Sequence, residues 1–480
     1  MKNIAFATIK ELRHLLDTKE ITAAELLDYT IKRFEQFDGD LGSALELFEK
    51  KSVLADVAQE GALAGIPCLI KDIIAQKGRK LTCASKILSG FTSTIDATVV
   101  SRIKAAGGLL VGRANCDEFA MGSSNETSAY KIVKNPWDHS RVPGGSSGGS
   151  IAAVAAGLVP YALGTETGGS VRQPAAFCGI VGSKPTYGLI SRYGLVAYAS
   201  SLDQVGVATR TVYDNALVFS VIAGQDACDS STLPVAQKDY TATLDGTLSK
   251  GLVIGVLDDA LHAEGVDPEV TQAIEQALKE LEKLGAKIKR VSLPVLDYGI
   301  AAYVILSRAE AASNLSKFDG VRYGDRVLEA QTLEEMYCKT RHNGFGSEVR
   351  RRILVGNYVL SAGHAAAFYD NAKKVQNLIR QGFLDLFKDV NVLVMPVTPT
   401  PAFKIGGITN PLQMDLQDYF TCPINVAGIP AVSVPCGFTK NNLPIGFQFV
   451  GPHLSEELLF KTAHAYEQAT SWHTMHPEGY

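Results

Sequence analysis

The stretch PGGSSGGS, residues 143–150, is the part of the sequence that decides the fold. It packs four glycines and three serines into eight residues, and the small apolar run IAAVAAG follows at once. This composition is typical of three kinds of segment: a flexible linker, a phosphate-binding loop, or a turn that carries a catalytic serine. Each interpretation predicts different neighbours along the chain.

The neighbours disfavour the first two interpretations. A linker separates two units, whereas this run lies between a turn, KNPWDHSRV, and a small-residue segment at 150–157 that we expect to be a helix. A phosphate-binding loop places a lysine and then Ser or Thr after its last glycine, and here Ser150 is followed by Ile151.

The third interpretation needs a base for the serine. Gly144-x-Ser146-x-Gly148 matches the turn that presents a nucleophile. None of the nine histidines lies in a comparably glycine-rich segment, so a Ser–His–Asp triad is compatible with the sequence but unsupported by it. A neutral lysine can activate a serine instead. Lys71, after the apolar run GIPCLI, is a candidate; the ordinary alternative is a strand-end lysine whose ammonium reaches water.

A second glycine-rich run, TETGGSVRQPAAFCG, spans residues 165–179. Here Ser170 follows Gly168 and Gly169, and successive unhindered backbone amides can bind an oxyanion. Lys71, Ser146 and Ser170 together form a candidate catalytic group.

Apolar spacing predicts an α/β protein. Residues 8–36 have the period of two helices, with Thr22 and Glu25 as a capping box. Strand–helix–strand order elsewhere predicts a mostly parallel sheet. We expect one domain, residues 1–480, with a helical insertion or flanking layer at about 300–388. The other expected strands lie at 65–72, 107–113 and 389–401 and within 248–259, the helices at 96–107 and 150–157, and a helix followed by a strand at 268–293.

Composition narrows the class of function. The chain has 480 residues, 46% hydrophobic and 20% charged, with a net charge of −4, which disfavours a self-sufficient nucleic-acid binder. Its eight cysteines contain no CxxC pair, so we expect reduced thiols in the cytoplasm and no zinc site. The N-terminus lacks the features of a signal peptide, and the longest uncharged run, 142–165, is too weakly apolar for a membrane span.

The two glycine–serine runs and GIPCLIKD closely resemble the diagnostic segments of the amidase signature family. The resemblance implies a large mixed, mostly parallel sheet with helices on both faces. It also implies a Ser–cis-Ser–Lys triad: Lys71 as the base, Ser146 as a bridging serine on a cis peptide bond, and Ser170 as the nucleophile. The implied oxyanion hole consists of the amides of Thr167, Gly168, Gly169 and Ser170.

Flanking segments, among them NCDEFAMGSSNETSAY and PINVAGIPAVSVPCG, resemble one branch of this family, the glutamine-hydrolysing subunits of tRNA-dependent amidotransferases. This implies glutamine as the substrate and two partner subunits, B and C, with ATP, Mg²⁺ and aminoacyl-tRNA bound at the partner. The product would be Gln-tRNA(Gln) from Glu-tRNA(Gln), with Asp-tRNA(Asn) as a second substrate left open.

The same resemblance implies an arginine and an aspartate for the two charged α-groups of glutamine. The matching positions are Arg351, in EVRRRILVG, and Asp418, in LQDYFTCP. The register of the arginine run allows a shift by one residue. The alternatives are a solvated helix face for Arg351 and a loop acid or helix cap for Asp418.

Three positions depart from the family pattern: Ile73, Glu166 and Lys131 stand where asparagine, aspartate and glycine are usual. None belongs to the triad. Two other functions stay open from the sequence: a stand-alone amidase acting on another carboxamide, and a non-catalytic scaffold that kept the fold.

Overall fold

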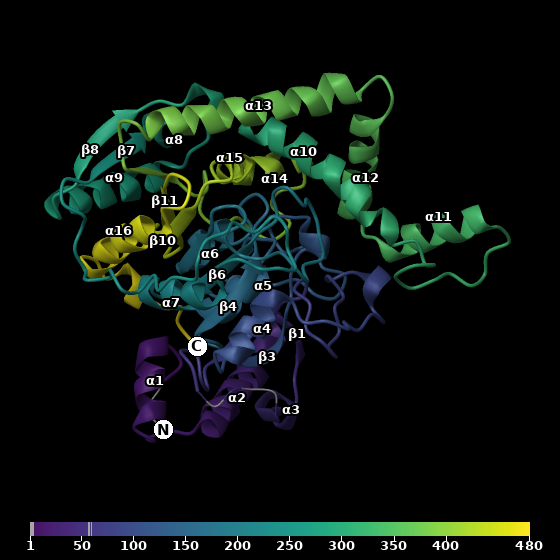
Figure 1. Cartoon of the computed structure of the whole chain (residues 1–480), viewed down its shortest axis with the longest axis horizontal. Helices are drawn as coiled ribbons and strands as arrows, with labels where there is room; N and C mark the ends of the chain where they lie inside the picture. The colour runs from purple at the N-terminus through teal and green to yellow at the C-terminus, as the bar shows by residue number, and fades with distance from the viewer. Residues whose placement is uncertain (1–3, 56–57, 59) are drawn as a thin grey trace.

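The computed structural model describes residues 4–55, 58 and 60–480. A single mixed sheet runs through this part of the chain, with helices packed on both faces (Figure 1). Across the sheet, the strand order is β1-β3-β2-β4-β6-β5-β10-β11-β9-β7-β8. The predicted α/β class is therefore confirmed. The strands in the described residues are β1 (Ala44–Leu47), β2 (Pro67–Lys71), β3 (Leu109–Ala114), β4 (Tyr161–Thr165), β5 (Val181–Lys184), β6 (Val205–Thr209), β7 (Val253–Leu257), β8 (Lys287–Val291), β9 (Val392–Pro396), β10 (Ala431–Phe438) and β11 (Pro444–Val450).

Strand direction differs from the prediction of a mostly parallel sheet. Among the described residues, four of the ten strand pairings are parallel, in two groups near the ends of the sheet, β3-β2-β4 and β9-β7-β8. The other six pairings are antiparallel. The prediction extended the strand–helix–strand patterns to the whole sheet. The centre contains a hairpin, β10–β11, and a connection as short as residues 439–443 joins only antiparallel strands.

Helix α2 begins directly after the predicted N-cap residue, Thr22. Thr22 accepts the N–H of Glu25, and the Glu25 carboxylate accepts the N–H of Thr22 at 2.8 Å, so the predicted capping box is present. The α-helices in the described residues are α1 (Ile9–Asp17), α2 (Ala23–Leu41), α3 (Lys50–Ala55), α4 (Thr98–Ala105), α5 (Gly148–Ala155), α6 (Arg172–Cys178), α7 (Val212–Ile222), α8 (Asp258–Leu261), α9 (Pro268–Lys283), α10 (Gly299–Asn314), α11 (Leu333–Gly344), α12 (Ser347–Leu360), α13 (Ala365–Leu386), α14 (Pro411–Asp415), α15 (Cys422–Ala427) and α16 (Glu456–Gln468).

Helices α10 to α13 lie between β8 and β9 in the chain, over the segment predicted to be helical. Helix α10 packs against α12, α13 and α15. Helix α13 runs along the upper side of the molecule in Figure 1, and α11 projects at the right.

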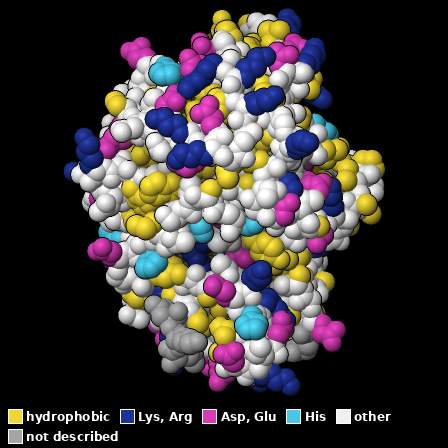
Figure 2. Space-filling model, turned by 90° about the vertical axis from the view of Figure 1, so that its left-hand side faces the viewer, with side chains coloured by type: hydrophobic (Ala, Val, Ile, Leu, Met, Phe, Trp, Pro, Cys, Tyr) yellow, Lys and Arg dark blue, Asp and Glu magenta, His cyan; other side chains and the backbone are white. Residues whose placement is uncertain are grey.

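Alternation along β9 shows how both faces are buried. Val392 and Val394 pack into one hydrophobic core, and Leu393 and Met395 into another on the opposite face. On the face in Figure 2, Lys and Arg side chains are interspersed with Asp and Glu and form no continuous basic field. Within the described ranges, no helix combines the length and the apolar character that crossing a membrane requires.

Candidate active site

Lys71 is the last residue of β2, which lies between β3 and β4, and its side chain is fully buried. The Lys71 Nζ atom lies 2.7 Å from Ser146 Oγ, 2.9 Å from Thr165 Oγ1 and 3.0 Å from Ser147 Oγ. The amine therefore contacts three hydroxyl groups, and the interpretation of a strand-end lysine that reaches water is wrong.

Burial lowers the pKa of Lys71 from its usual value to about 8, because charging an amine that is closed to water costs free energy. The acidic groups of Asp117, Glu166 and Asp203 act in the opposite direction. A useful fraction of the amine is therefore uncharged near neutral pH. A neutral amine beside a hydroxyl can act as a general base.

The run at 143–150 leads into α5, whose first three residues are Gly148, Gly149 and Ser150. Every residue in the run is buried, so the linker interpretation is wrong. The peptide bond between Gly145 and Ser146 is cis. A Cβ atom at Gly145 would lie 2.1 Å from Asp117 Oδ2, so only glycine fits there. Asp117 is fixed in turn by the backbone N–H of Asn125 at 2.9 Å and the hydroxyl of Thr127 at 2.8 Å.

Ser170 lies in the turn that follows β4, beside the first turn. Its carbonyl oxygen accepts the N–H of Ser147 at 3.1 Å, which joins the two glycine–serine runs. The Ser170 side chain makes no hydrogen bond to any described residue, whereas Lys71 and Ser146 are in contact. In the described part of the chain, the contact between Lys71 and Ser146 is thus formed, and a hydrogen bond between the Ser146 and Ser170 hydroxyls is not.

The backbone amides of this second turn are also unpaired. In the described part of the chain, no hydrogen bond is made by the N–H groups of Thr167, Gly168, Gly169 and Ser170. Unpaired amides on a tight turn beside a serine are typical of a site for developing negative charge.

A buried ion pair between Glu166 and Arg172 stabilises the turn that contains Ser170. The Glu166 carboxylate accepts the backbone N–H of Val171 and Arg172 and lies 2.7 Å from the Arg172 guanidinium. Arg172 also donates to Gln448 at 2.6 Å and to Asn425. Both carboxylate oxygens of Glu166, the residue that stands where aspartate is usual, therefore have hydrogen-bond partners.

The structure places the two neighbouring arginines of this run in different surroundings. Arg351 is paired with Glu348 at 2.7 Å, and its side chain is 33% exposed. The Arg352 side chain is only 6% exposed, contacts Glu348 as well, and donates to the Tyr198 hydroxyl at 2.9 Å. The arginine that faces the interior is therefore Arg352.

Asp418 is buried against the Ser170 turn. A Cβ atom at Gly169 would lie 2.8 Å from Asp418 Oδ1. Its other oxygen accepts the Ser123 hydroxyl, while Oδ1 has no hydrogen-bond partner among the described residues. Burial raises the pKa of Asp418 to about 8, and the charge of Arg352 opposes this shift. An unpaired buried carboxyl beside Ser170 is suited to bind a cationic group.

The side chains at the other two departures make no hydrogen bond or ion pair with Lys71, Ser146 or Ser170 in the described part of the chain. Ile73 is buried in the hydrophobic core. Lys131 lies 3.4 Å from Asp38 and remains partly exposed. The contacts of Ser147 and Thr165 with Lys71 were missed from the sequence, although both residues belong to the quoted runs. Among the described residues, no cluster of three or more His, Cys, Asp or Glu side chains is placed to hold a metal ion.

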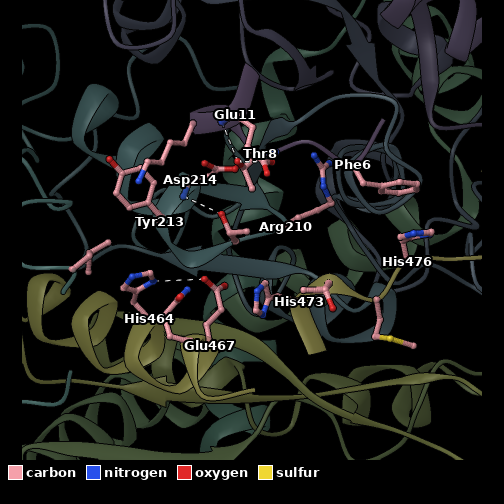
Figure 3. Close-up of a pocket in the computed structure, with 16 residues that line it drawn as sticks. Phe6, Thr8, Glu11, Arg210, Tyr213, Asp214, His464, Glu467, His473 and His476 are labelled. Carbon is pink, nitrogen blue, oxygen red and sulfur yellow. Dashed lines mark hydrogen bonds and ion pairs between the residues drawn. The ribbon is translucent and has the colours of Figure 1, made fainter. Parts of the chain in front are cut away.

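A separate cavity of about 510 Å³ lies between α1, α7 and α16 (Figure 3). Its lining residues do not include Lys71, Ser146 or Ser170. Buried charges in its wall fix the N-terminal segment, because Asp214 accepts the N–H of Ile9 at 2.9 Å and Arg210 donates to the Ala7 carbonyl. These contacts join the N-terminal segment to the residues at the start of α7.

The sheet, the enclosed lysine and the two serine turns define an amidase. Residues 25–460 match the family model described as Amidase, and the chain belongs to this family. Its relatives include proteins named as the A subunit of glutamyl-tRNA(Gln) amidotransferase. The one from Halothermothrix orenii is 50% identical over 473 residues, 98% of each chain. The one from Chromohalobacter salexigens is 51% identical over 478 residues, again 98% of each.

Solved structures give the same result. The crystal structure of the glutamyl-tRNA(Gln) amidotransferase A subunit from Thermotoga maritima has a TM-score of 0.85 and 41% identity, covering 99% of this chain and 98% of that one. A 6-aminohexanoate cyclic dimer hydrolase also has a TM-score of 0.85, at 26% identity, covering 99% of each chain. The family resemblance seen in the sequence is thus confirmed.

Proposed function

We propose that this chain is the glutaminase subunit of a tRNA-dependent amidotransferase. The observation that carries the proposal is the buried hydrogen bond between Lys71 Nζ and Ser146 Oγ, 2.7 Å long. It lies beside the turn at residues 167–170, whose backbone N–H groups make no hydrogen bond in the described part of the chain. The choice of glutamine over other amides rests on relatives about half identical over nearly the whole chain.

The proposed reaction starts with a proton relay. Neutral Lys71 accepts the hydroxyl proton of Ser146, and Ser146 accepts that of Ser170. The Ser170 oxygen attacks the side-chain amide carbon of glutamine, and the amides of residues 167–170 stabilise the oxyanion. The relay returns a proton to the leaving nitrogen, which departs as ammonia. Water then hydrolyses the glutamyl ester by the same relay and releases glutamate.

Substrate recognition follows from the two buried charges. Asp418 Oδ1 lacks a partner among the described residues and suits the α-ammonium of glutamine. Arg352 suits the α-carboxylate, because a guanidinium binds a carboxylate through two parallel hydrogen bonds. A stand-alone amidase for simple carboxamides has no use for this pair.

The partner carries the rest of the reaction in this proposal. Ammonia passes to a B subunit, which converts Glu-tRNA(Gln), and Asp-tRNA(Asn) where the partner accepts it, using ATP and Mg²⁺ bound there, while a small C subunit joins the two. The setting is the cytoplasm. The net charge of −4 supports this division, because tRNA binding by this chain alone requires a basic surface.

The test is co-purification from native lysate, with mass identification of the bound chains, followed by assays of the complex. Ser170→Ala is expected to abolish glutamine-dependent amidation and to preserve amidation supplied with free ammonia. Ser150→Ala is the matched control and keeps both activities, because Ser150 lies in the same glycine–serine run as Ser146 but its hydroxyl donates to the Leu163 carbonyl. Loss of both activities in Ser170→Ala contradicts ammonia transfer, and faster turnover of aryl amides than of glutamine contradicts the glutaminase assignment.

A further inference from the structure

The carbonyl group of Gly168, in the Ser170 turn, is held from outside that turn. Its oxygen accepts the hydroxyl of Thr421 at 2.7 Å and the thiol of Cys422 at 3.2 Å. Both side chains are completely buried. Cys422 begins α15, which packs against α10 and α13, so both donors stand on a rigid support.

Fixing this carbonyl also fixes the next amide. In a planar trans peptide unit, the C=O of Gly168 and the N–H of Gly169 point in opposite directions. The Gly169 N–H has no partner in the described part of the chain. A hydroxyl that holds one end of the peptide unit therefore aims the other end at the position of the oxyanion.

We propose that Thr421 is a positioning residue for the oxyanion hole: its hydroxyl orients the Gly168–Gly169 peptide so that the Gly169 amide donates to the reacting oxygen. The inference rests on the proposed glutaminase function. It assigns the role to Thr421 and not to Cys422, because the hydroxyl is the stronger donor and lies closer.

The close fit of the turn supports this role. A Cβ atom at Gly169 would lie 2.3 Å from Thr421 Oγ1, so Thr421 is packed directly on the turn. Its backbone N–H donates to the Asp418 carbonyl at 3.1 Å. Thr421, which orients the peptide, is thus hydrogen-bonded to Asp418, the residue proposed to bind the α-ammonium.

The test separates chemistry from binding. Thr421→Val keeps the shape and removes the donor; we expect kcat to fall about 10- to 100-fold, somewhat less than the loss of a complete oxyanion donor, with KM within about threefold. Thr421→Ser restores kcat to within about threefold. Thr462→Val is the matched control and keeps kcat, because Thr462 is equally buried but its hydroxyl donates to the Leu458 carbonyl within its own helix.

A second measurement compares the binding of glutamine with that of an analogue. The analogue carries an aldehyde in place of the side-chain amide and forms a tetrahedral adduct with Ser170. Thr421→Val is expected to weaken this adduct by the same factor as kcat and to leave glutamine binding unchanged. Should Thr421→Val fail to fold, Thr421→Cys, with a weaker donor, is expected to give an intermediate kcat. An unchanged kcat, a change in KM alone, or an equal loss of affinity for the aldehyde analogue and for glutamine overturns the inference. An inactive wild-type complex overturns the proposed function instead.

Discussion

The amine of Lys71 lies 2.7 Å from the hydroxyl oxygen of Ser146, and neither group is exposed to solvent. The pKa of about 8 at Lys71 makes this contact sensitive to pH. The relay requires the neutral amine, which is the minor form below this pKa. We expect kcat to fall about tenfold per pH unit below pH 8 and to level off above it.

The second-order rate constant is expected to depend on pH more steeply than kcat. Asp418 also has a pKa of about 8 and must be ionised to take up a cation. Without substrate, both groups need to lose a proton, so kcat/KM falls about a hundredfold per unit well below pH 8. Bound substrate keeps Asp418 ionised, which leaves the single step in kcat. In Asp418→Asn, the kcat/KM profile should lose one step; a profile like that of the wild type contradicts the role of Asp418.

Lys184 provides a control for the buried base. It is a second fully buried lysine, and its amine donates to the Pro185 carbonyl instead of contacting the serines. Lys71→Met is expected to reduce glutamine hydrolysis to background, whereas Lys184→Met changes stability but keeps the pH profile of kcat. Comparable activity in both variants would remove Lys71 as the base.

Arg351 and Arg352 offer a test of which arginine binds the α-carboxylate of glutamine. Arg352→Lys is expected to raise KM for glutamine about 10- to 100-fold, because lysine cannot form two parallel bonds to a carboxylate. Arg351→Lys should stay within about twofold of the wild type. The difference should disappear with glutamine whose α-carboxylate is converted to an amide. A larger effect for Arg351→Lys would restore the original assignment.

The ion pair between Glu166 and Arg172 is fully buried. Glu166→Gln leaves the guanidinium without its counter-charge, and we expect the free energy of unfolding to fall by about 3–5 kcal/mol, measured by urea unfolding. Asp17→Asn, which removes the exposed partner of Arg13, should leave the urea midpoint unchanged within error. Similar midpoints for the two variants would show that the buried pair is not a major source of stability.

Local patterns predicted much of the fold. The capping box at Thr22 and the strand that ends at Lys71 were predicted from a few neighbouring residues each, and both are present. The antiparallel centre could not be predicted in this way. It pairs β5 with β10, about 250 residues apart in the chain, and no local spacing encodes such a partner. The short helix α6 was missed because its sequence, RQPAAFC, contains no full amphipathic period.

The burial of Arg352, by contrast, had a signal in the sequence. In α12, the buried residues are Val349, Arg352, Ile353, Gly356 and Val359, which is the spacing of one helix face. Arg352 belongs to that face and Arg351 does not. Matching by motif alone ignored the phase of the helix. Ser147 and Thr165 were missed for another reason. Their contacts with Lys71 depend on the pairing of β2 with β4 and on where the 143–150 segment lies against these strands.

The central hairpin has a consequence for how the protein is made. Strands β10 and β11 are the last two along the chain, yet they join β5 on one side to β9 on the other. A chain still being synthesised on the ribosome has two unconnected half-sheets until residues 431–450 emerge. The segment around Asp418 and Thr421 leads directly into this hairpin. Synthesis of this hairpin thus joins the two half-sheets shortly after the segment that packs against the Ser170 turn has been made.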